Sequence, residues 1–331
     1  MLFLSVLGAL GGLTVFMLGL RCVSRNMGAL ITGKLSAVVY KATSNPLSAV
    51  GIGATVTAVA QSSVAINMVL VSLVDGGAVS LIGACAVVVG TNVGTTITAQ
   101  LTSLSFSSFD MAAAGALLAF VGFLLSSLTK NRISVVGEIV LGFGLIFIGI
   151  NFLTEEIENF YGYDLFRAFF LIKEPLVLIL NGFMITALCQ SSSVVSSMLV
   201  ILSSGGLITF NNAVYLILGA NIGTTVCVMV FSLKKSLAAR QTAFFNFLFN
   251  VIGSVLFALA MAFAGDGIAA LFAGTCSSAG RAVANFHTFF NLFTGLTVLP
   301  FLKPLASLTG LIIKDNQKSS VEKGRNCRKT V

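Results

Sequence analysis

TAVAQSS at residues 57–63 recurs as TALCQSS at residues 186–192, and the two copies lie 129 positions apart. The same spacing relates TNVGTT at residues 91–96 to ANIGTT at residues 220–225. Two matches in one register are not expected from chance similarity between apolar stretches. The sequence is therefore predicted to contain two homologous halves of about 130 residues.

Further matches extend this repeat upstream. GLTVFMLGL at residues 12–20 resembles GFGLIFIGI at residues 142–150, at a spacing of 130. The predicted domains are a first repeat, a second repeat, a C-terminal transmembrane extension and a basic cytoplasmic tail. Their ranges are 1–130, 131–262, 263–305 and 306–331.

The composition excludes an ordinary water-soluble fold. Hydrophobic residues make up 56% of the 331 positions and charged residues 9%, against about 25% charged residues in soluble domains. Uncharged apolar stretches of about 18 residues or more recur along the chain, which predicts several membrane-spanning helices. Strand patterns of alternating polarity are missing, which argues against an outer-membrane barrel. An all-α polytopic membrane protein is therefore the predicted fold class.

The net charge of +8 points to membrane topology rather than to nucleic acid. Many of the cations lie in short loops or in the tail KDNQKSSVEKGRNCRKTV at residues 314–331. This is the positive-inside pattern of a multi-pass protein. We expect a protein of the cell (inner) membrane whose basic C-terminal tail is cytoplasmic.

Loop charges predict that the two halves are inverted. Residues 21–45 contain four cations and no acid, whereas their counterpart at 151–174 contains five acids and two cations. The first loop is therefore expected inside and the second outside. Inverted repeats with a binding site at their interface are a common plan of secondary transporters.

The segments 46–74 and 175–203 are predicted to be re-entrant helical hairpins. If each segment instead crossed the membrane once, the acidic loop would face the cytoplasm and Lys130 and Arg132 the exterior. Hairpins that return to their own side place every basic loop inside, as the charge rule favours.

The Q-S-S motifs lie near the centres of these two segments, where each hairpin must turn. Glutamine and serine oxygens with freed carbonyls offer neutral ligands for Na⁺. Half-helix N-termini at the same turn suit an anion such as phosphate or a carboxylate. The competing interpretation, in which the hydroxyls only join helices, is disfavoured by the paired placement. The candidate binding residues are Gln61, Ser62, Ser63, Gln190, Ser191, Ser192 and Ser193.

A second pair of motifs, GTNVGTT and GANIGTT, places asparagine and threonine beside glycine. Glycine permits a break in a helix or a close approach of backbones. We expect a broken transmembrane helix in each half that completes the oxygen cage; the alternative is a glycine-rich helix interface. The residues concerned are Asn92, Thr95, Thr96, Asn221, Thr224 and Thr225.

A third motif lies toward the C-terminus. RQTAFFNFLFN at residues 240–250 aligns with RAVANFHTFFN at residues 281–291, and both fit R-x5-[NH]-x2-F-N. The second copy contains His287, the single histidine of the chain. An intramembrane histidine either relays protons or senses pH, or it serves as a neutral packing and hydrogen-bonding group.

No catalytic set is visible, because the acids avoid the predicted membrane cores apart from Glu138. A nucleophile–base pair or a metal cluster would need side chains that the sequence does not offer. An enzyme is not expected. An anion channel remains an alternative, since oxygen-lined breaks also form selectivity filters.

These motifs resemble the type II family of Na⁺/phosphate cotransporters in its bacterial form, over roughly residues 1–305. The resemblance implies Na⁺-coupled transport of inorganic phosphate by alternating access, with Na⁺ as coupling ion and no cofactor. It also implies that the two Q-S-S turns meet near the midplane and carry substrate and Na⁺. Transport of another small anion, such as sulfate or a dicarboxylate, and phosphate export are the alternatives.

Two departures from the family pattern matter. Val64 stands where the full Q-S-S-S signature has a serine, whereas Ser193 fills that place in the second copy, so the number of Na⁺ ions stays open. Many bacterial members also carry a soluble PhoU-like domain at the C-terminus, and we expect this chain to be a short form without one.

Overall fold

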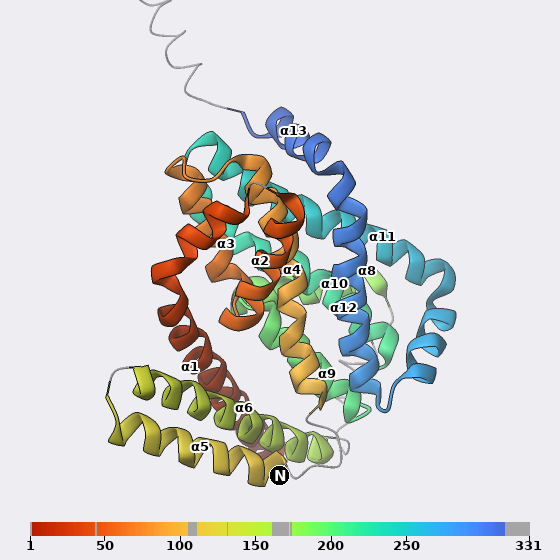
Figure 1. Cartoon of the computed structure of the whole chain (residues 1–331). Coiled ribbons are helices and arrows are strands. Elements are labelled where there is room, and N and C mark those ends of the chain that lie inside the picture. The colour runs from red at the N-terminus through yellow and green to blue at the C-terminus, as the bar shows by residue number, and fades with distance from the viewer. Residues whose placement is uncertain are drawn as a thin grey trace, which may run out of the picture.

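The structure is a computed structural model that describes residues 2–43, 45–104, 111–130, 132–160, 172 and 174–314. All regular secondary structure in these residues is helical (Figure 1), which confirms the predicted all-α class. Six of the described helices are long and apolar enough to cross a membrane, by length and composition. The basic tail from residue 315 onward and the loop at 161–171 lie outside the described residues.

The elements of the first half run from α1 to α5. They are α1 (Leu2–Ala42), α2 (Pro46–Ala60), α3 (Ser63–Asp75), α4 (Leu81–Leu104) and α5 (Met111–Leu128). The remaining elements are α6 (Arg132–Phe160), α8 (Pro175–Cys189), α9 (Ser192–Ser204), α10 (Phe210–Ser232), α11 (Leu237–Thr275), α12 (Ala279–Val298), η1 (Leu299–Phe301) and α13 (Leu302–Ile312).

Helices α1 and α6 form an antiparallel pair in which equivalent residues exchange places. A β-carbon added at Gly12 would lie 3.0 Å from the backbone nitrogen of Leu153. One added at Gly142, the counterpart of Gly12, would lie 3.0 Å from that of Val23. Val23 is in turn the counterpart of Leu153, so the contact is self-complementary in the manner of a two-fold interface. How the halves face the two sides of a membrane stays a prediction.

Helix α5 packs on the other side of α6, again through glycine. A β-carbon at Gly122 of α5 would collide with the backbone of Leu141 in α6, and one at Gly137 of α6 with that of Ser126. Figure 1 shows α5 and α6 side by side below the bundle, with α1 rising from them toward α2. Small residues permit this close approach in membrane helices.

Each short hairpin packs on one long helix, α2 on α4 and α8 on α10. A β-carbon at Gly90 of α4 would collide with the Val50 carbonyl of α2. The counterpart Gly219 of α10 would collide in the same way with the Ile179 carbonyl of α8. The glycines of GTNVGTT and GANIGTT thus let the backbone of a neighbouring helix approach closely. This agrees with the alternative interpretation, a glycine-rich helix interface.

The predicted break in each of these long helices is wrong. Helices α4 and α10 run without interruption through GTNVGTT and GANIGTT. The side chains of Asn92 and Asn221 lie along their own helices. Each Nδ2 donates to the carbonyl four residues earlier, that of Val88 or Ile217, at 2.9 Å in both cases. A break would have left main-chain groups unpaired, and helical continuation satisfies them.

The segment after α10 contacts both hairpins. Asp75, the last residue of α3, accepts a hydrogen bond from the Ser236 N–H (2.7 Å) and pairs with Lys235 (3.1 Å) just before α11. The hydrogen bond from the Ser236 N–H is the main cause that lowers the pKa of the Asp75 carboxyl below its ordinary value, and the hydrogen bond from Lys235 lowers it further. Helix α12 begins against α9 instead, where a β-carbon at Gly280 would lie 2.6 Å from the Val200 carbonyl. The boundaries predicted for the domains stay predictions.

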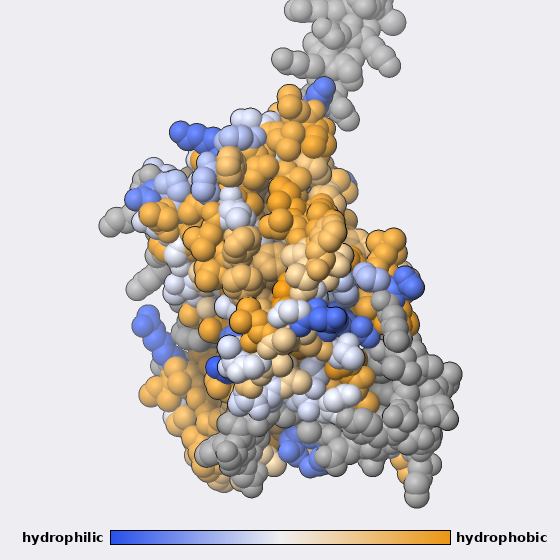
Figure 2. Space-filling view, turned by 90° about the vertical axis from the view of Figure 1, so that its right-hand side faces the viewer, coloured by the Kyte–Doolittle hydropathy of each residue, from blue (hydrophilic) through white to orange (hydrophobic). Residues whose placement is uncertain are grey.

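Two apolar clusters form the core of the described residues. One joins α2, α3 and α4 with the start of α11 and with α13, and the other joins α8, α9 and α10 with α1, α6 and α12. Large apolar side chains also cover the outside: Phe263, Leu188 and Leu128 are each more than three-quarters exposed. Figure 2 shows such side chains over much of one face. An apolar exterior of this extent is that of a protein embedded in lipid.

Gly90→Ala is expected to destabilise the fold by about 1–3 kcal/mol, because the added methyl group overpacks the contact between α4 and α2. The measurement is thermal unfolding of the purified protein in detergent. Gly51→Ala on α2 is the matched control, since a β-carbon there meets nothing within 4 Å. Equal losses for the two variants would contradict the assignment of Gly90 to a backbone contact.

Candidate functional site

The first Q-S-S motif forms the turn between α2 and α3. Gln61 ends α2 in the left-handed conformation (φ 54°, ψ 22°), and its N–H donates to the Thr57 carbonyl at 2.8 Å. Ser62 then caps α3, since its Oγ accepts from the Ala65 N–H at 3.3 Å. The helix is therefore broken where the sequence predicts a turn.

The second Q-S-S motif repeats this geometry between α8 and α9. Gln190 has φ 56° and ψ 24°, and its N–H donates to the Thr186 carbonyl at 2.7 Å. Ser191 accepts from the Val194 N–H at 3.4 Å. Among the described residues, Gln61 and Gln190 are the two non-glycine residues with positive φ. Left-handed non-glycine residues cost about 1–3 kcal/mol and cluster at functional sites.

The side chains of the two glutamines differ in their contacts. Gln61 Oε1 accepts from the Thr98 hydroxyl at 2.6 Å, and its Nε2 donates to the Ala58 carbonyl at 2.7 Å. The counterpart of Thr98 in α10 is Cys227, and Gln190 is exposed. The first turn is thus tied to its long helix, whereas the second turn presents its glutamine at the surface.

Three of the five candidate serines are buried more deeply than the glutamines. Ser63, Ser192 and Ser193 are each less than a tenth exposed, at the start of α3 and α9. The Ser193 carbonyl accepts from the Ser196 hydroxyl at 3.2 Å. These residues start the helices whose first N–H groups have no partner within the helix.

Helix α4 connects the two hairpins. The Thr102 hydroxyl lies 2.9 Å from the Thr98 carbonyl and 2.9 Å from the Ser197 hydroxyl of α9. A polar path therefore runs from Gln61 through Thr98 and Thr102 to Ser197. No hydrogen bond among the described residues joins the two turns directly, so their meeting at one site stays a prediction.

Two threonines that the sequence analysis did not single out adjoin the turns. Thr57 and Thr186 occupy equivalent places four residues before the glutamines, and both hydroxyls are buried with no partner in the described part of the chain. A β-carbon at Gly94 would lie 2.9 Å from the Thr57 Cβ, and one at Gly223 would lie 3.0 Å from the Thr186 Cβ. Buried hydroxyls without partners suggest an ion or water that completes them. Both threonines stand first in the repeated motifs TAVAQSS and TALCQSS, and this repetition is the feature of the sequence that could have identified them.

The predicted asparagines contact the third motif. Asn92 donates to Asn246 Oδ1 at 3.1 Å. Its counterpart Asn221 lies 3.4 Å from His287 Nε2 through its Oδ1. Asn246 and His287 are themselves equivalent in R-x5-[NH]-x2-F-N, so the motif supplies one amide or imidazole partner to each half. His287 is 1% exposed, which agrees with a packing and hydrogen-bonding role.

The predicted threonines bond within their own helices. Thr95 and Thr224 donate to the Thr91 and Ala220 carbonyls one turn back. Thr96 and Thr225 donate to the carbonyls of the third residue before each. Their protons are used locally, which leaves only oxygen lone pairs to offer to a cation.

A further polar cluster joins the end of α4 to the start of α12. Gln100 Nε2 donates to Thr288 Oγ1 (2.8 Å) and to Asn285 Oδ1 (3.1 Å). Arg281 donates to the Ser103 hydroxyl at 3.1 Å. Within the described part of the chain the ion pair found is Lys235–Asp75, so Arg281 has no carboxylate partner there. The sequence offered the arginine of the third motif as a signal, but not the partners that α4 supplies.

Comparison with known proteins assigns the sequence to a family. The profile of the Na⁺/Pi-cotransporter family matches residues 15–155 and again residues 149–299. This chain belongs to the Na⁺/Pi-cotransporter family. Each match covers one Q-S-S hairpin with its long helix. The chain is therefore a member of a family of membrane transporters, which is not a family of enzymes.

Three relatives illustrate the range of similarity. The putative inorganic phosphate export protein YjbB of Escherichia coli strain K12 is 30% identical over 297 residues, 88% of this chain and 52% of the relative. The uncharacterized protein YqeW of Bacillus subtilis is 27% identical over 303 residues, 90% and 95% of the two chains. The sodium-dependent phosphate transport protein 2A of the rabbit is 33% identical over 73 residues, 22% and 11% of the two chains. This chain spans about half the length of the Escherichia coli relative. No solved structure matches it.

Asn246→Leu is expected to lower the free energy of unfolding by about 1–3 kcal/mol, because the buried Asn92 Nδ2, which keeps its bond to the Val88 carbonyl, loses its second acceptor. Thermal or denaturant unfolding in detergent measures the loss. Asn181→Leu is the control, since no hydrogen bond of its side chain is found among the described residues. An Asn246→Leu variant as stable as the control would show that the Asn92 contact contributes nothing.

Proposed function

We propose that the protein is a secondary active transporter that couples Na⁺ to inorganic phosphate by alternating access, with the two Q-S-S turns as its binding site. The observation that carries this proposal is the pair of left-handed glutamine turns, each followed by a serine-capped half-helix. A helix break at membrane depth is tolerated where the backbone is buried in protein or lines a cavity, and two matched breaks support a site of the second kind. The family supplies the class of substrate.

The anion is proposed to bind at the N-termini of α3 and α9. Their first N–H groups point along the helix axis toward the turn, and the helix dipole adds a partial positive charge there. Na⁺ is proposed to bind the neutral oxygens of the same turns: the glutamine carbonyls, the serine hydroxyls, and the unpartnered hydroxyls of Thr57 and Thr186. Hard cations prefer such oxygen ligands.

The unequal state of the two turns supports alternating access. Gln61 is tied to Thr98 and half-buried, while Gln190 is exposed. Alternating access moves one repeat or bundle against the other around the site. In this structure the glutamine of the second turn is the more exposed of the two.

The decisive experiment is uptake of labelled phosphate into liposomes that contain the purified protein. With an inward Na⁺ gradient we expect phosphate to accumulate above its external concentration, and with K⁺ in place of Na⁺ we expect no accumulation. Ser192→Ala and Gln190→Ala are expected to abolish uptake. Ser203→Ala, which removes a buried hydroxyl without a partner at the other end of α9, is the matched control.

Three results would change this proposal. A downhill flux that needs no Na⁺ would identify an anion channel, and competition by sulfate or a dicarboxylate would identify another substrate. A phosphate affinity that does not depend on Na⁺ would contradict the proposal that the two ions share one site. Coupling between two ligands amounts to about 1–3 kcal/mol in typical cases, so the expected change in affinity lies well within measurement.

Net export is the second candidate function, because a relative that covers most of this chain is named a putative phosphate export protein. The site would be the same, and only the direction of flux in the cell would differ. Liposomes loaded with phosphate and Na⁺ report this directly: efflux faster than influx under equal and opposite gradients favours export.

Arg281 is predicted to raise the local concentration of phosphate at the start of α12. Its guanidinium and the helix N-terminus both carry positive charge, and no carboxylate partner is found in the described residues. Arg281→Gln is expected to raise the KM for phosphate several-fold while kcat changes little. Arg132→Gln, on the exposed start of α6, is the control. An unchanged KM would remove Arg281 from the route.

A further inference from the structure

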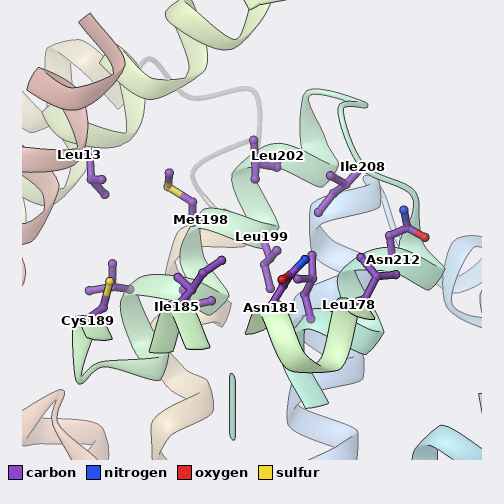
Figure 3. Close-up of a pocket in the computed structure, with 13 residues that line it drawn as sticks. Leu13, Leu178, Asn181, Ile185, Cys189, Met198, Leu199, Leu202, Ile208 and Asn212 are labelled. Atoms are coloured by element: carbon purple, nitrogen blue, oxygen red, sulfur yellow. The ribbon is translucent and has the colours of Figure 1, made fainter. Parts of the chain in front are cut away.

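A cavity of about 210 Å³ lies between the second hairpin and α1. Figure 3 shows it bordered by Leu13 of α1 at one end and by Asn212 of α10 at the other, with α8 and α9 between them. Its walls are apolar apart from two asparagines and a thiol. Leu13, Ile185, Cys189, Val195, Met198, Leu199 and Leu202 are among the residues that line it.

Water is a poor occupant of this cavity. A buried water needs two to four polar partners, and an apolar cavity of about 150 Å³ stays dry and binds benzene. Asn212 already donates its Nδ2 to the Ile172 carbonyl at 3.1 Å, so Asn181 is the one lining amide whose side chain makes no hydrogen bond among the described residues, too few partners for water to fill the cavity. A hydrated ion would likewise lose its shell against these walls, so the cavity is not an ion path.

The mouth of the cavity opens on the surface that lipid covers. Ile185 and Cys189 line the cavity and are also exposed at the surface of the molecule. On the same helix, Leu180, Met184 and Leu188 are each at least half exposed. An acyl chain lying along α8 therefore meets the opening without crossing any polar surface.

The other half carries a larger side chain at one wall position. The counterpart of Leu13 at the spacing of 130 is Phe143 of α6, so this position of the repeat accepts a phenyl ring.

We propose that this cavity binds one acyl chain of a phospholipid from the surrounding bilayer, which enters between Ile185 and Cys189 and lies against α9. A chain that moves from the bilayer into the cavity gains van der Waals contacts with wall atoms that otherwise have no partner there. Because α9 begins at the second Q-S-S turn, the bound chain packs directly on the helix that carries that turn. The inference holds whatever anion the protein transports.

The test uses the full chain in lipid nanodiscs that contain a trace of phospholipid with a diazirine at the end of one acyl chain. After irradiation, mass spectrometry locates the adducts. Val195, Leu199 and Leu202 are 7%, 5% and 8% exposed, so adducts on them require a chain inside the cavity. We expect adducts there and, as an internal reference, on the exposed Leu180 and Leu188.

Leu13→Phe is expected to abolish the adducts on Val195, Leu199 and Leu202 and to leave those on Leu180 and Leu188 unchanged. Leu10→Phe is the matched control, because it adds the same ring to the exposed side of α1 and should leave all adducts in place. Met198→Phe fills the cavity from α9 and replaces Leu13→Phe if that variant does not fold. Absence of adducts on the three buried residues, or their persistence in both filling variants, would overturn the proposal.

Discussion

The need to satisfy a broken main chain inside an apolar molecule is the constraint on which this structure depends. A helix that stops in lipid leaves N–H and C=O groups without partners, and each such group is costly there. The chain meets this demand twice with the same device. A left-handed glutamine returns its N–H to the carbonyl four residues back, and a serine caps the helix that follows. The first N–H groups of α3 and α9 are main-chain donors that remain at these turns, and they are the groups proposed to bind a ligand.

The long helices α4 and α10 make the two turns possible. Their glycines let each hairpin approach until backbones touch, so the hairpin is held by main-chain packing along its first helix rather than by bulky side chains. Such an interface tolerates little change in size, and it fixes where each turn lies. The side chains beside the turn are then free to diverge. Thr98 ties Gln61 in the first half, and Cys227 stands at the corresponding position in the second.

Much of this arrangement was predictable from the sequence because it depends on local periodicity and on repetition. The position of each turn follows from polar residues at the centre of an apolar segment, and the pairing of halves follows from one spacing. The predicted break at Asn92 and Asn221 failed for a physical reason: glycine permits either a break or a close contact, and the sequence does not say which neighbour approaches. The contact between Gln61 and Thr98 joins residues 37 positions apart on different helices, so no local pattern reveals it.

Equivalent positions of the two halves differ in residue type and in contacts, and the repeated motifs alone do not show these differences. Asn246 and His287 occupy one position of the third motif, yet the first makes a 3.1 Å contact with Asn92 and the second a 3.4 Å contact with Asn221. Leu13 and Phe143 likewise occupy one position of the repeat, and of the two only Leu13 borders the cavity beside the second hairpin. Such differences depend on three-dimensional packing, and they distinguish the two halves of a transporter whose motifs read almost alike.

The absence of any acid from both Q-S-S motifs bears on how the two proposed ligands interact. A cation held by neutral oxygens keeps its full charge, and an anion at two helix N-termini meets only partial positive charge. In a site of low dielectric constant each ion then gains most from the presence of the other. The proposed arrangement therefore predicts cooperative binding without a conformational change that links distant sites. By linkage, each ion raises the affinity for the other by the same factor. Val64 and Ser193 stand at equivalent places in the two turns, so the halves would contribute unequally to holding the cation.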